Sequence, residues 1–446
     1  MNERLHAVME EAGCSNTGLA RRVNSCGAER GLDLHYDKTS VARWLQGQQP
    51  RGRVPAVIAE ALGRKLGRTV TVDEIGMNPA PGLDTATGLR FEPTVKGALQ
   101  QVSGLWRSDA HRTGWSPGET LATSVLVQAS RDWLIADPDC AVTGNGHSEV
   151  GPADVMPVRA TTAAFADLDH RFGSGRIRPA AVCYLSTVVT ELLEGSYDES
   201  VGRQVLGAAA RLTELAGYMA VDVNQLGLAQ RYYIQALRLA QAASDRDFGG
   251  YMLASGMGHV ALLLGNPHEA VQLARVAREG VRGRSTAHVE TISYATEARG
   301  RALLGDARAC EKATEHAVEA LERSNHDEKP DWAAHVDRAY LAEELARCYQ
   351  DLNQFTNATQ WAQEALLGCS PGRARRRALR LLLLASIQLG QERVDEARGP
   401  ASQALEALKE VRSGQCSAAL DAFCDRLKAL GNEKEAWAPL CPEQRN

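Results

Sequence analysis

Aromatic residues make up only 5% of this 446-residue chain, whereas alanine and leucine are abundant. Because alanine and leucine favour helices, we expect an all-α fold. Long hydrophobic runs are missing as well: the longest, such as residues 381–385, are far shorter than a membrane span. The N-terminal segment MNERLHAVMEEAG is charged throughout and lacks the apolar stretch of a secretory signal. We therefore expect a cytoplasmic protein with no membrane partner.

The spacings that mark metal sites and catalytic centres are absent. The ten cysteines are scattered without a C-x-x-C pair, so we expect free thiols in helices and no metal site. Neither H-E-x-x-H nor G-x-S-x-G occurs, and the glycines of residues 63–69 lie too close together for a phosphate-binding loop. Gly144 and Gly146 lack the third glycine of a dinucleotide fingerprint. We expect no enzyme activity and no cofactor.

A local reversal of charge is the most informative feature present. The chain has a net charge of −5, yet residues 38–68 contain one acid, Glu60, among many cations. The basic residues of this window are Lys38, Arg43, Arg51, Arg53, Arg64, Lys65 and Arg68. A concentrated basic face on an acidic protein favours a phosphate-backbone partner.

The chain is too long for one hydrophobic core, and its composition suggests distinct sections. Residues 1–76 are expected to form a small helical domain, followed by a linker at 77–93 that is rich in proline and glycine. Residues 94–200 are expected to form a helical domain that precedes or caps the repeats of residues 201–440.

The helical domain at 94–200 has its own predicted elements. A Ser-Pro-x-Glu capping pattern at residues 116–119 predicts the start of a helix. Residues 137–157 are expected to form a long flexible loop. Helices over residues 159–170 and 180–194 should then pair around a glycine-rich turn.

Small residues seven positions apart recur along residues 201–440. The pairs are Ala229/Ala236, Ala270/Ala277, Cys310/Ala317, Ala358/Ala365 and Ala397/Ala404. Three of the pairs follow a turn of the form Leu-Gly or Leu-Asn, at residues 264–267, 304–307 and 352–355. Positions seven apart share one face of a helix, and small side chains there allow a neighbouring helix to approach closely. This pattern resembles tetratricopeptide repeats, although its period of about 40 residues is longer than usual. The resemblance implies a TPR-like α-solenoid of about five repeats, with a further helix pair capping the chain at residues 413–438.

The first 76 residues resemble the helix-turn-helix domain of small phage-repressor-type (XRE) regulators. Helices are expected at residues 3–12, from Ser15 onward, at residues 38–45 and at residues 55–66. Val41, Trp44 and Leu45 form the buried stripe of the third helix, which should end at Gly47.

The resemblance also implies which residues contact DNA. Lys38, Thr39, Ser40 and Arg43 are expected at the outer face of the third helix, where the family contacts bases. Arg51 and Arg53 are expected to bind phosphates. About twelve residues, 25–36, separate the second and third helices where the family has a tight turn. The second helix must therefore be extended, or the loop must bulge.

The whole arrangement resembles actinobacterial regulators with C-terminal tetratricopeptide repeats, and it is similar in plan to peptide-sensing quorum-sensing regulators. It implies a homodimer that binds double-stranded DNA and senses a small molecule or peptide. The concave surface of such an array offers polar and aromatic residues as ligand candidates, each of which could equally serve packing. They are Tyr251, His259, Tyr294, Arg301, His335, Arg338 and Tyr340.

Five arginines in residues 373–380, RARRRALR, could form a solvated face, hold an anionic ligand or make a second DNA contact. We expect a sequence-specific transcriptional regulator. The alternative is a TPR scaffold that sequesters another protein and uses its basic head for docking.

Overall fold

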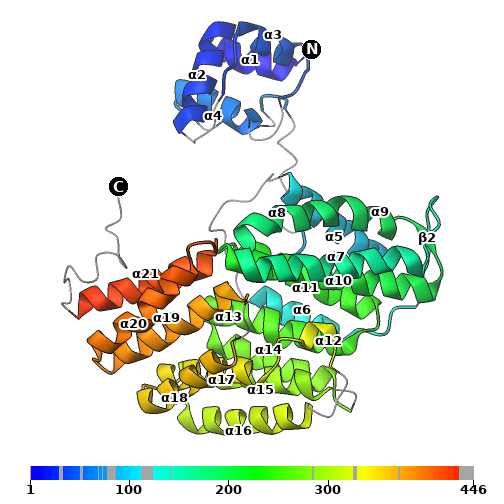
Figure 1. Cartoon of the computed structure of the whole chain (residues 1–446). Helices are drawn as coiled ribbons and strands as arrows, with labels where there is room; N and C mark the ends of the chain where they lie inside the picture. Colours follow the sequence, from blue (N-terminus) through cyan, green and yellow to red (C-terminus); the bar gives the residue numbers. More distant parts are fainter. Residues whose placement is uncertain are drawn as a thin grey trace. The chain divides into compact units, whose positions relative to one another are not determined.

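The computed structural model describes residues 2–29, 34–50, 54–68, 70–72, 74–77, 87–111, 124–140, 142–283, 286–324, 329–369 and 372–430. The chain divides into two compact units, Met1–Thr87 with Ser108–Ser116, and Gly88–Arg107 with Pro117–Asn446. The described part is helical apart from one pair of two-residue strands, so the predicted all-α class is confirmed (Figure 1).

The described residues of the first unit form four helices around one core. They are α1 (Glu3–Glu11), α2 (Asn16–Glu29), α3 (Lys38–Leu45) and α4 (Val54–Leu66). Apolar side chains from all four meet in this core, among them the fully buried Leu5, Leu19, Val41 and Ile58. The side chain of Asn2 closes the unit, because it caps α1 and donates to the carbonyls of Ile75 and Gly76.

The second unit begins with helices that the sequence predicted only in part. They are α5 (Val95–Ala110), α6 (Ser124–Ile135), α7 (Pro152–Phe172), α8 (Ser174–Tyr184) and α9 (Thr190–Leu193), with a π-helical segment at Leu185–Val189. The predicted capping pattern at residues 116–119 lies outside the described residues.

The expectation of a loop throughout residues 137–157 is wrong. Strand β1 (Gly144–Asn145) pairs with β2 (Ser196–Tyr197), and α7 already begins at Pro152. Pro152 occupies the first helical turn, where its missing N–H is not needed, and the Asp154 side chain accepts the N–H of Gly151 at 2.8 Å. The helix predicted from residue 180 likewise begins earlier, at Ser174, and includes Pro179.

Consecutive helices then pair in sequence order (Figure 1). They are α10 (Glu199–Asp222), α11 (Leu226–Ala242), α12 (Arg246–Tyr251), α13 (Gly258–Leu263), α14 (Pro267–Gly280), α15 (Ala287–Leu303), α16 (Ala307–Ser324), α17 (Arg338–Asp351), α18 (Phe355–Leu367), α19 (Ala374–Gly390), α20 (Val394–Ala407) and α21 (Gly414–Ala429). A π-helical segment at Met252–Met257 joins α12 to α13, and a 3-10 turn at Asp331–Ala333 precedes α17. Of the expected capping pair at residues 413–438, the described part contains α21.

The small-residue pairs lie at helix contacts. Each pair falls on the second helix of a hairpin, namely α11, α14, α16, α18 and α20. All ten side chains are at most 2% exposed. The repeated spacing in the sequence therefore corresponds to a repeated packing position.

A second repeated feature lies in the turns before those helices. A residue with positive φ stands two positions before each of α11, α14, α16, α18 and α20; these residues are Asn224, Gly265, Gly305, Asn353 and Glu392. In each turn this residue and the next donate to carbonyls near the end of the preceding helix, as in Gly265 N–H to Leu262 (3.0 Å) and Asn266 N–H to Ala261 (2.9 Å). This is the Schellman pattern of helix termination. Two of the five turns, at Asn224 and Glu392, lack the Leu-Gly or Leu-Asn signature.

Glu392 should be replaceable by glycine with a gain in stability. It is exposed and has φ 60°, a conformation that costs a residue with a side chain about 1–2 kcal/mol. The greater freedom of glycine in the unfolded chain offsets about half of this gain. We expect Glu392→Gly to raise the free energy of unfolding, measured by chemical denaturation, by roughly 0.5–1 kcal/mol. As the matched control, Gly265→Ala should lower it by a similar amount, since nothing but its φ of 72° opposes the added methyl group. A loss of stability in Glu392→Gly would contradict the argument.

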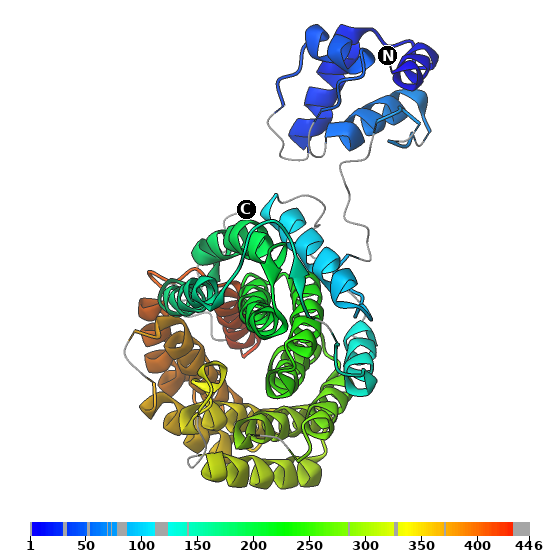
Figure 2. The ribbon, with the colours of Figure 1, turned by 90° about the vertical axis from the view of Figure 1, so that its right-hand side faces the viewer.

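The end of the second unit packs against its beginning. Figure 2 shows its helices on a curved path that brings α19–α21 beside α7 and α10. Backbone bonds contribute to this contact, since the N–H of Arg412 donates to Phe172 at 2.9 Å. Residues 152–184 thus contact both the first and the last helices of the array.

Two further observations concern classes of site. Among the described helices, none is both long and apolar enough to cross a bilayer. Of the cysteines that the structure describes, eight are free thiols, but Cys424 is disulfide-bonded, so the expectation of free thiols is wrong at that position.

Candidate functional site

Helix α3 presents one buried and one exposed face. Val41 and Trp44 are 0% and 4% exposed and pack in the core of the first unit, with Leu45 half-buried beside them. Lys38, Thr39 and Arg43 are exposed, as expected for the outer face.

Ser40 holds the N-terminus of α3. The Asp37 carboxylate accepts the Ser40 N–H at 2.8 Å, and the Asp37 N–H donates to the Ser40 hydroxyl oxygen at 3.5 Å, which is a capping box; the Ser40 hydroxyl also donates to the carboxylate at 2.9 Å. The hydrogen bond from the Ser40 backbone is the main cause that lowers the pKa of Asp37, so the cap is ionised at neutral pH. The Ser40 hydroxyl is therefore engaged in the cap of α3.

The C-terminus of α3 ends in a Schellman turn. Gly47 has φ 99°, its N–H donates to Trp44, and the N–H of Gln48 donates to Arg43, both at 3.0 Å. These bonds fix the last turn of the helix, from which the Arg43 side chain projects.

Contacts at both ends fix the connection between α2 and α3, residues 25–36. Helix α2 extends to Glu29, which accounts for the first part of residues 25–36. The Asn24 amide then binds the backbone of Tyr36 twice, accepting its N–H and donating to its carbonyl, each at 2.9 Å. The Tyr36 ring packs edge-on against Trp44, with centroids 5.0 Å apart. The chain therefore enters α3 from a fixed position despite the insertion.

Several cations of the basic window are engaged within the first unit. Arg64 pairs with Glu60 at 2.8 Å, and Arg68 pairs with Glu11 and Glu74 at 2.8 and 2.6 Å. Lys65 donates to the carbonyl of Gly13 at 2.6 Å.

Fewer cations of residues 38–68 are therefore available to a partner than the number of basic residues in the sequence suggests. Arg51 and Arg53 lie outside the described residues. Among the cations of this window that the structure describes, Lys38 and Arg43, both on α3, form no ion pair.

Three of the seven ligand candidates come together in the second unit. Tyr251 of α12 lies 5.9 Å from His335, and His335 lies 5.5 Å from Tyr340 of α17, as ring centroids. Trp332 joins them at 4.9 Å from Tyr251. Glu214 of α10 hydrogen-bonds to Tyr251, and burial raises the pKa of this carboxyl to about 7. Segments far apart in the sequence thus build one aromatic cluster with a titratable carboxyl beside it.

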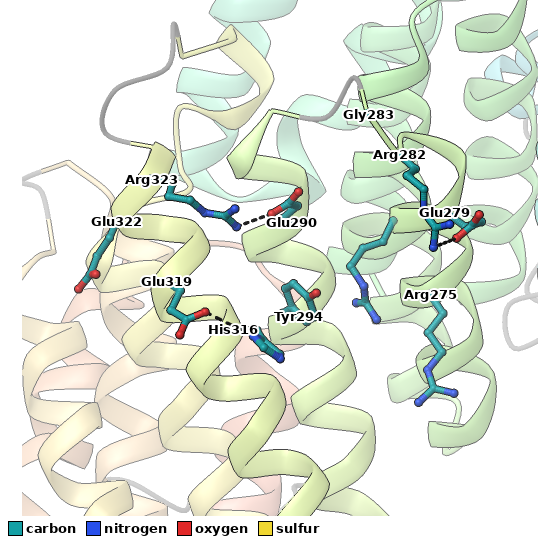
Figure 3. A pocket seen from close by; sticks show the side chains of 11 residues that line it. Arg275, Glu279, Arg282, Gly283, Glu290, Tyr294, His316, Glu319, Glu322 and Arg323 are labelled. Carbon is teal, nitrogen blue, oxygen red and sulfur yellow. Dashed lines mark hydrogen bonds and ion pairs between the residues drawn. The ribbon is translucent and has the colours of Figure 1, made fainter.

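Tyr294 lies in a different place, a cavity of about 1000 Å³ between α14, α15 and α16 (Figure 3). The Arg278 guanidinium stacks over its ring at 4.2 Å, and His316 lies 5.0 Å away. Opposite charges on the walls are paired with one another, as in Arg282–Glu279 and Arg323–Glu290. This cavity is polar and internally neutralised, so it offers little excess charge to a ligand.

The remaining three candidates are separate from the aromatic cluster. His259 is exposed on α13. Arg301 lies near Glu297 and Asp306, at 3.8 and 3.6 Å. Arg338 is exposed, pairs with Glu364 at 2.6 Å and stacks over Trp361.

The arginine run at residues 373–380 is not a simple solvated face. Arg375 is 3% exposed and pairs with Asp169 of α7 at 2.7 Å and Asp222 of α10 at 3.3 Å. Arg380 is 2% exposed; it pairs with Glu343 at 2.9 Å and donates to two backbone carbonyls. Arg375 and Arg380 thus connect helices inside the second unit, and we call these two residues the arginine struts. Sequence reasoning missed them because their partners lie far away along the chain.

No group of three or more His, Cys, Asp or Glu side chains in the described ranges is arranged to hold a metal ion. Comparison with known families gives a match to the SP15 N-terminal domain over residues 5–78. This match covers α1–α4, the unit that carries α3, and none of the helices of the second unit. A comparison with curated proteins gives no match.

Proposed function

We propose that this protein is a sequence-specific DNA-binding transcriptional regulator, with the first unit as its DNA-binding head. The main support for this proposal is the structure of α3. It is a short helix capped at both ends, pressed into the core by Val41 and Trp44, with the cations Lys38 and Arg43 on its exposed side. Such a helix fits the major groove, where arginine can bind guanine through two hydrogen bonds and threonine can contact a base by hydroxyl or methyl group.

The charge distribution supports a directional contact with DNA. Arg64, Lys65 and Arg68, on α4 and just after it, are engaged with acids or carbonyls of the first unit, whereas the cations of α3 form no ion pair in the described residues. Phosphate attraction would therefore be strongest around α3, which favours docking by this face. The contacts of Asn24 with Tyr36 add to this, since a base-contacting helix must be held in one orientation.

In this proposal the second unit dimerises and senses a signal. A dimer would present two α3 helices to two half-sites, and the ligand would favour one arrangement of the helix pairs over another. Ligand and operator would then be coupled through the spacing of the two heads. The paired helices of the second unit and its aromatic cluster are the features that support a sensing role.

Selection from a random duplex library with the full-length protein tests the proposal. We expect enrichment of a palindromic sequence, with non-specific binding that weakens steeply between about 50 and 200 mM salt while specific binding persists. Binding that fades with salt equally for all sequences would overturn the proposal. It would leave the scaffold alternative, in which the basic head docks on another protein.

A further inference from the structure

The charges that line the cavity between α14, α15 and α16 are neutral in sum but separated in space. Four arginines and four glutamates line it. Figure 3 shows Arg275 and Arg282 of α14 on one side, His316 and Glu319 of α16 on the other, and Tyr294 of α15 between them. The cavity therefore offers little net charge to a ligand, yet its two walls can differ in sign.

The wall formed by α14 has an excess of positive charge. Arg275 and Arg278 share one carboxylate, that of Glu297 on α15: Arg275 donates to one of its oxygens at 2.9 Å and Arg278 donates to the other. Arg282 and Glu279 balance each other at 2.7 Å. Since one carboxylate compensates one guanidinium, a positive charge remains on this wall. The Arg275 side chain is 57% exposed and that of Arg278 19%, so Arg275 is the cation that a ligand can reach.

The opposite wall has an excess of negative charge. Glu290 is balanced by Arg323, which pairs with it at 2.5 Å. Within the described ranges Glu319 pairs with His316 alone, at 3.4 Å, and an imidazole compensates a carboxylate only when both its nitrogens are protonated. Glu322 lines the cavity too, but Figure 3 shows its side chain directed away from the other lining residues. Glu319 is therefore the carboxylate that faces the cavity without a permanent cation beside it.

Tyr294 forms the floor between the two walls. The Arg278 guanidinium stacks over its ring at 4.2 Å, and the His316 ring lies 5.0 Å from it. These two contacts restrict the orientation of the ring. The Tyr294 hydroxyl forms no hydrogen bond with any residue that the structure describes, so it is available to a ligand as a donor or an acceptor.

We propose that this cavity binds a small zwitterion, with its carboxylate at Arg275 and its ammonium at Glu319. A guanidinium binds a carboxylate through paired, charge-assisted hydrogen bonds, and a carboxylate accepts charge-assisted hydrogen bonds from an ammonium. Because Tyr294 lies between the two walls, the charged groups of the ligand must be several bonds apart, as in an ω-amino acid or a short peptide. A cavity of about 1000 Å³ has room for such a molecule. This inference rests on the sensing role proposed for the second unit, but its test needs no DNA.

The test is ligand-observed saturation-transfer NMR with the full-length protein at neutral pH and constant ionic strength. The probes are ε-aminocaproate, which carries both charges, and caproate and hexylamine, which have a chain of the same length and one charge each. We expect ε-aminocaproate to bind with a dissociation constant on the order of 1 mM, at least about tenfold more tightly than either singly charged probe. Triglycine is the fourth probe: if it binds more tightly than ε-aminocaproate, the zwitterion is a peptide, and if it binds more weakly, the zwitterion is an ω-amino acid.

Arg275→Gln and Glu319→Gln each remove the charge of one wall, and each should weaken the binding of ε-aminocaproate at least about tenfold. In Glu319→Gln the affinity for caproate should stay unchanged, which separates the loss of the ammonium contact from a folding defect. In Arg275→Gln, Arg278 still pairs with Glu297, so no buried carboxylate is left without a cation.

Glu315→Gln and Arg308→Gln are the matched controls, because both residues are exposed on α16 and neither is among the residues that line the cavity. Both variants should bind ε-aminocaproate as the wild type does. Equal affinities for the zwitterion and its singly charged analogues, wild-type binding in Arg275→Gln and Glu319→Gln, or no saturable binding of any probe would overturn the assignment. A failure to select DNA leaves this outcome untouched, so the two proposals fail separately.

Discussion

Replacing Arg375 by alanine is expected to lower the free energy of unfolding of the second unit by about 3–5 kcal/mol. Arg375 is the cation between two carboxylates, Asp169 and Asp222, which are 0% and 4% exposed. Without it, both carboxylates stay buried with no guanidinium to compensate them. The loss is a large share of the stability of a typical domain.

The network around Arg375 also explains why the effect should spread. Ser174 donates to Asp169, and its N–H donates to Asp222 at 3.1 Å, while Ser413 donates to the other oxygen of Asp222. Helices α7, α8, α10, α19 and the cap of α21 therefore meet at these two carboxylates. Chemical denaturation followed by helicity measures the loss.

The expected deficit depends on pH. Burial raises the pKa of Asp169 above its ordinary value of 3.8, and Arg375 opposes this. In the variant the pKa rises further, so the folded state holds a proton that the unfolded chain releases. Stability of the variant then falls as pH increases from the unfolded to the folded pKa. The loss in free energy of unfolding of Arg375→Ala, relative to the wild type, should accordingly be smaller at about pH 5 than at about pH 7.5.

Arg377→Ala provides the control, because Arg377 is exposed on the same helix and should change stability by no more than about 0.5 kcal/mol. Adding Asp169→Asn to Arg375→Ala should restore part of the loss, since it removes one buried charge. If Arg375→Ala unfolded at the same denaturant concentration as Arg377→Ala, the ion pairs of Arg375 would contribute nothing to stability.

The arginine struts show that a sequence alone does not reveal which charged residues pair in the fold. Arg375 lies about 200 positions from Ser174, a partner in the same network, and a count of local charges gave no indication of it. The same limit applies to the basic window, where Arg68 is engaged by Glu11, 57 positions away. Charge patterns describe what is near along the chain, whereas pairing depends on what folding brings together.

Elements specified by local chemistry were predictable. Helix α3 has the predicted bounds because its cap, its i, i+3, i+4 stripe and Gly47 all lie within ten residues of one another. The start of α7 was missed, although Pro152 occupies the first turn of the helix, where proline is tolerated. The turn at Glu392 was missed because its left-handed residue is neither glycine nor asparagine.

The candidate ligand residues illustrate both cases. Tyr251, His335 and Tyr340 meet in one cluster, while Tyr294 lines a separate cavity. From the sequence, polar and aromatic residues on the repeat helices could be selected as candidates, but the distances between these residues could not be predicted. Trp332 and Glu214 belong to the cluster and were not among the candidates; the sequence carried no signal that placed them there.

Arg43→Ala is expected to lower affinity for the selected operator by about tenfold to a hundredfold, with a smaller effect on non-specific DNA. Arg43 is exposed in the last turn of α3, and it forms no ion pair in the described residues, so its removal leaves Val41, Trp44 and the cap intact. The loss should therefore come from a base contact rather than from folding. Titrations of operator and scrambled duplexes at several salt concentrations measure both affinities.

The salt dependence distinguishes a base contact from a phosphate contact. If Arg43 binds a base edge, the variant should lose preference at one operator position. If it binds a phosphate, affinity should fall equally for all sequences, with a salt slope lower by about 1. Arg64→Ala is the matched control, because Arg64 lies on α4 and is paired with Glu60. Unchanged operator affinity in Arg43→Ala, with Arg64→Ala equally silent, would remove α3 from the DNA contact and favour a docking role for the head.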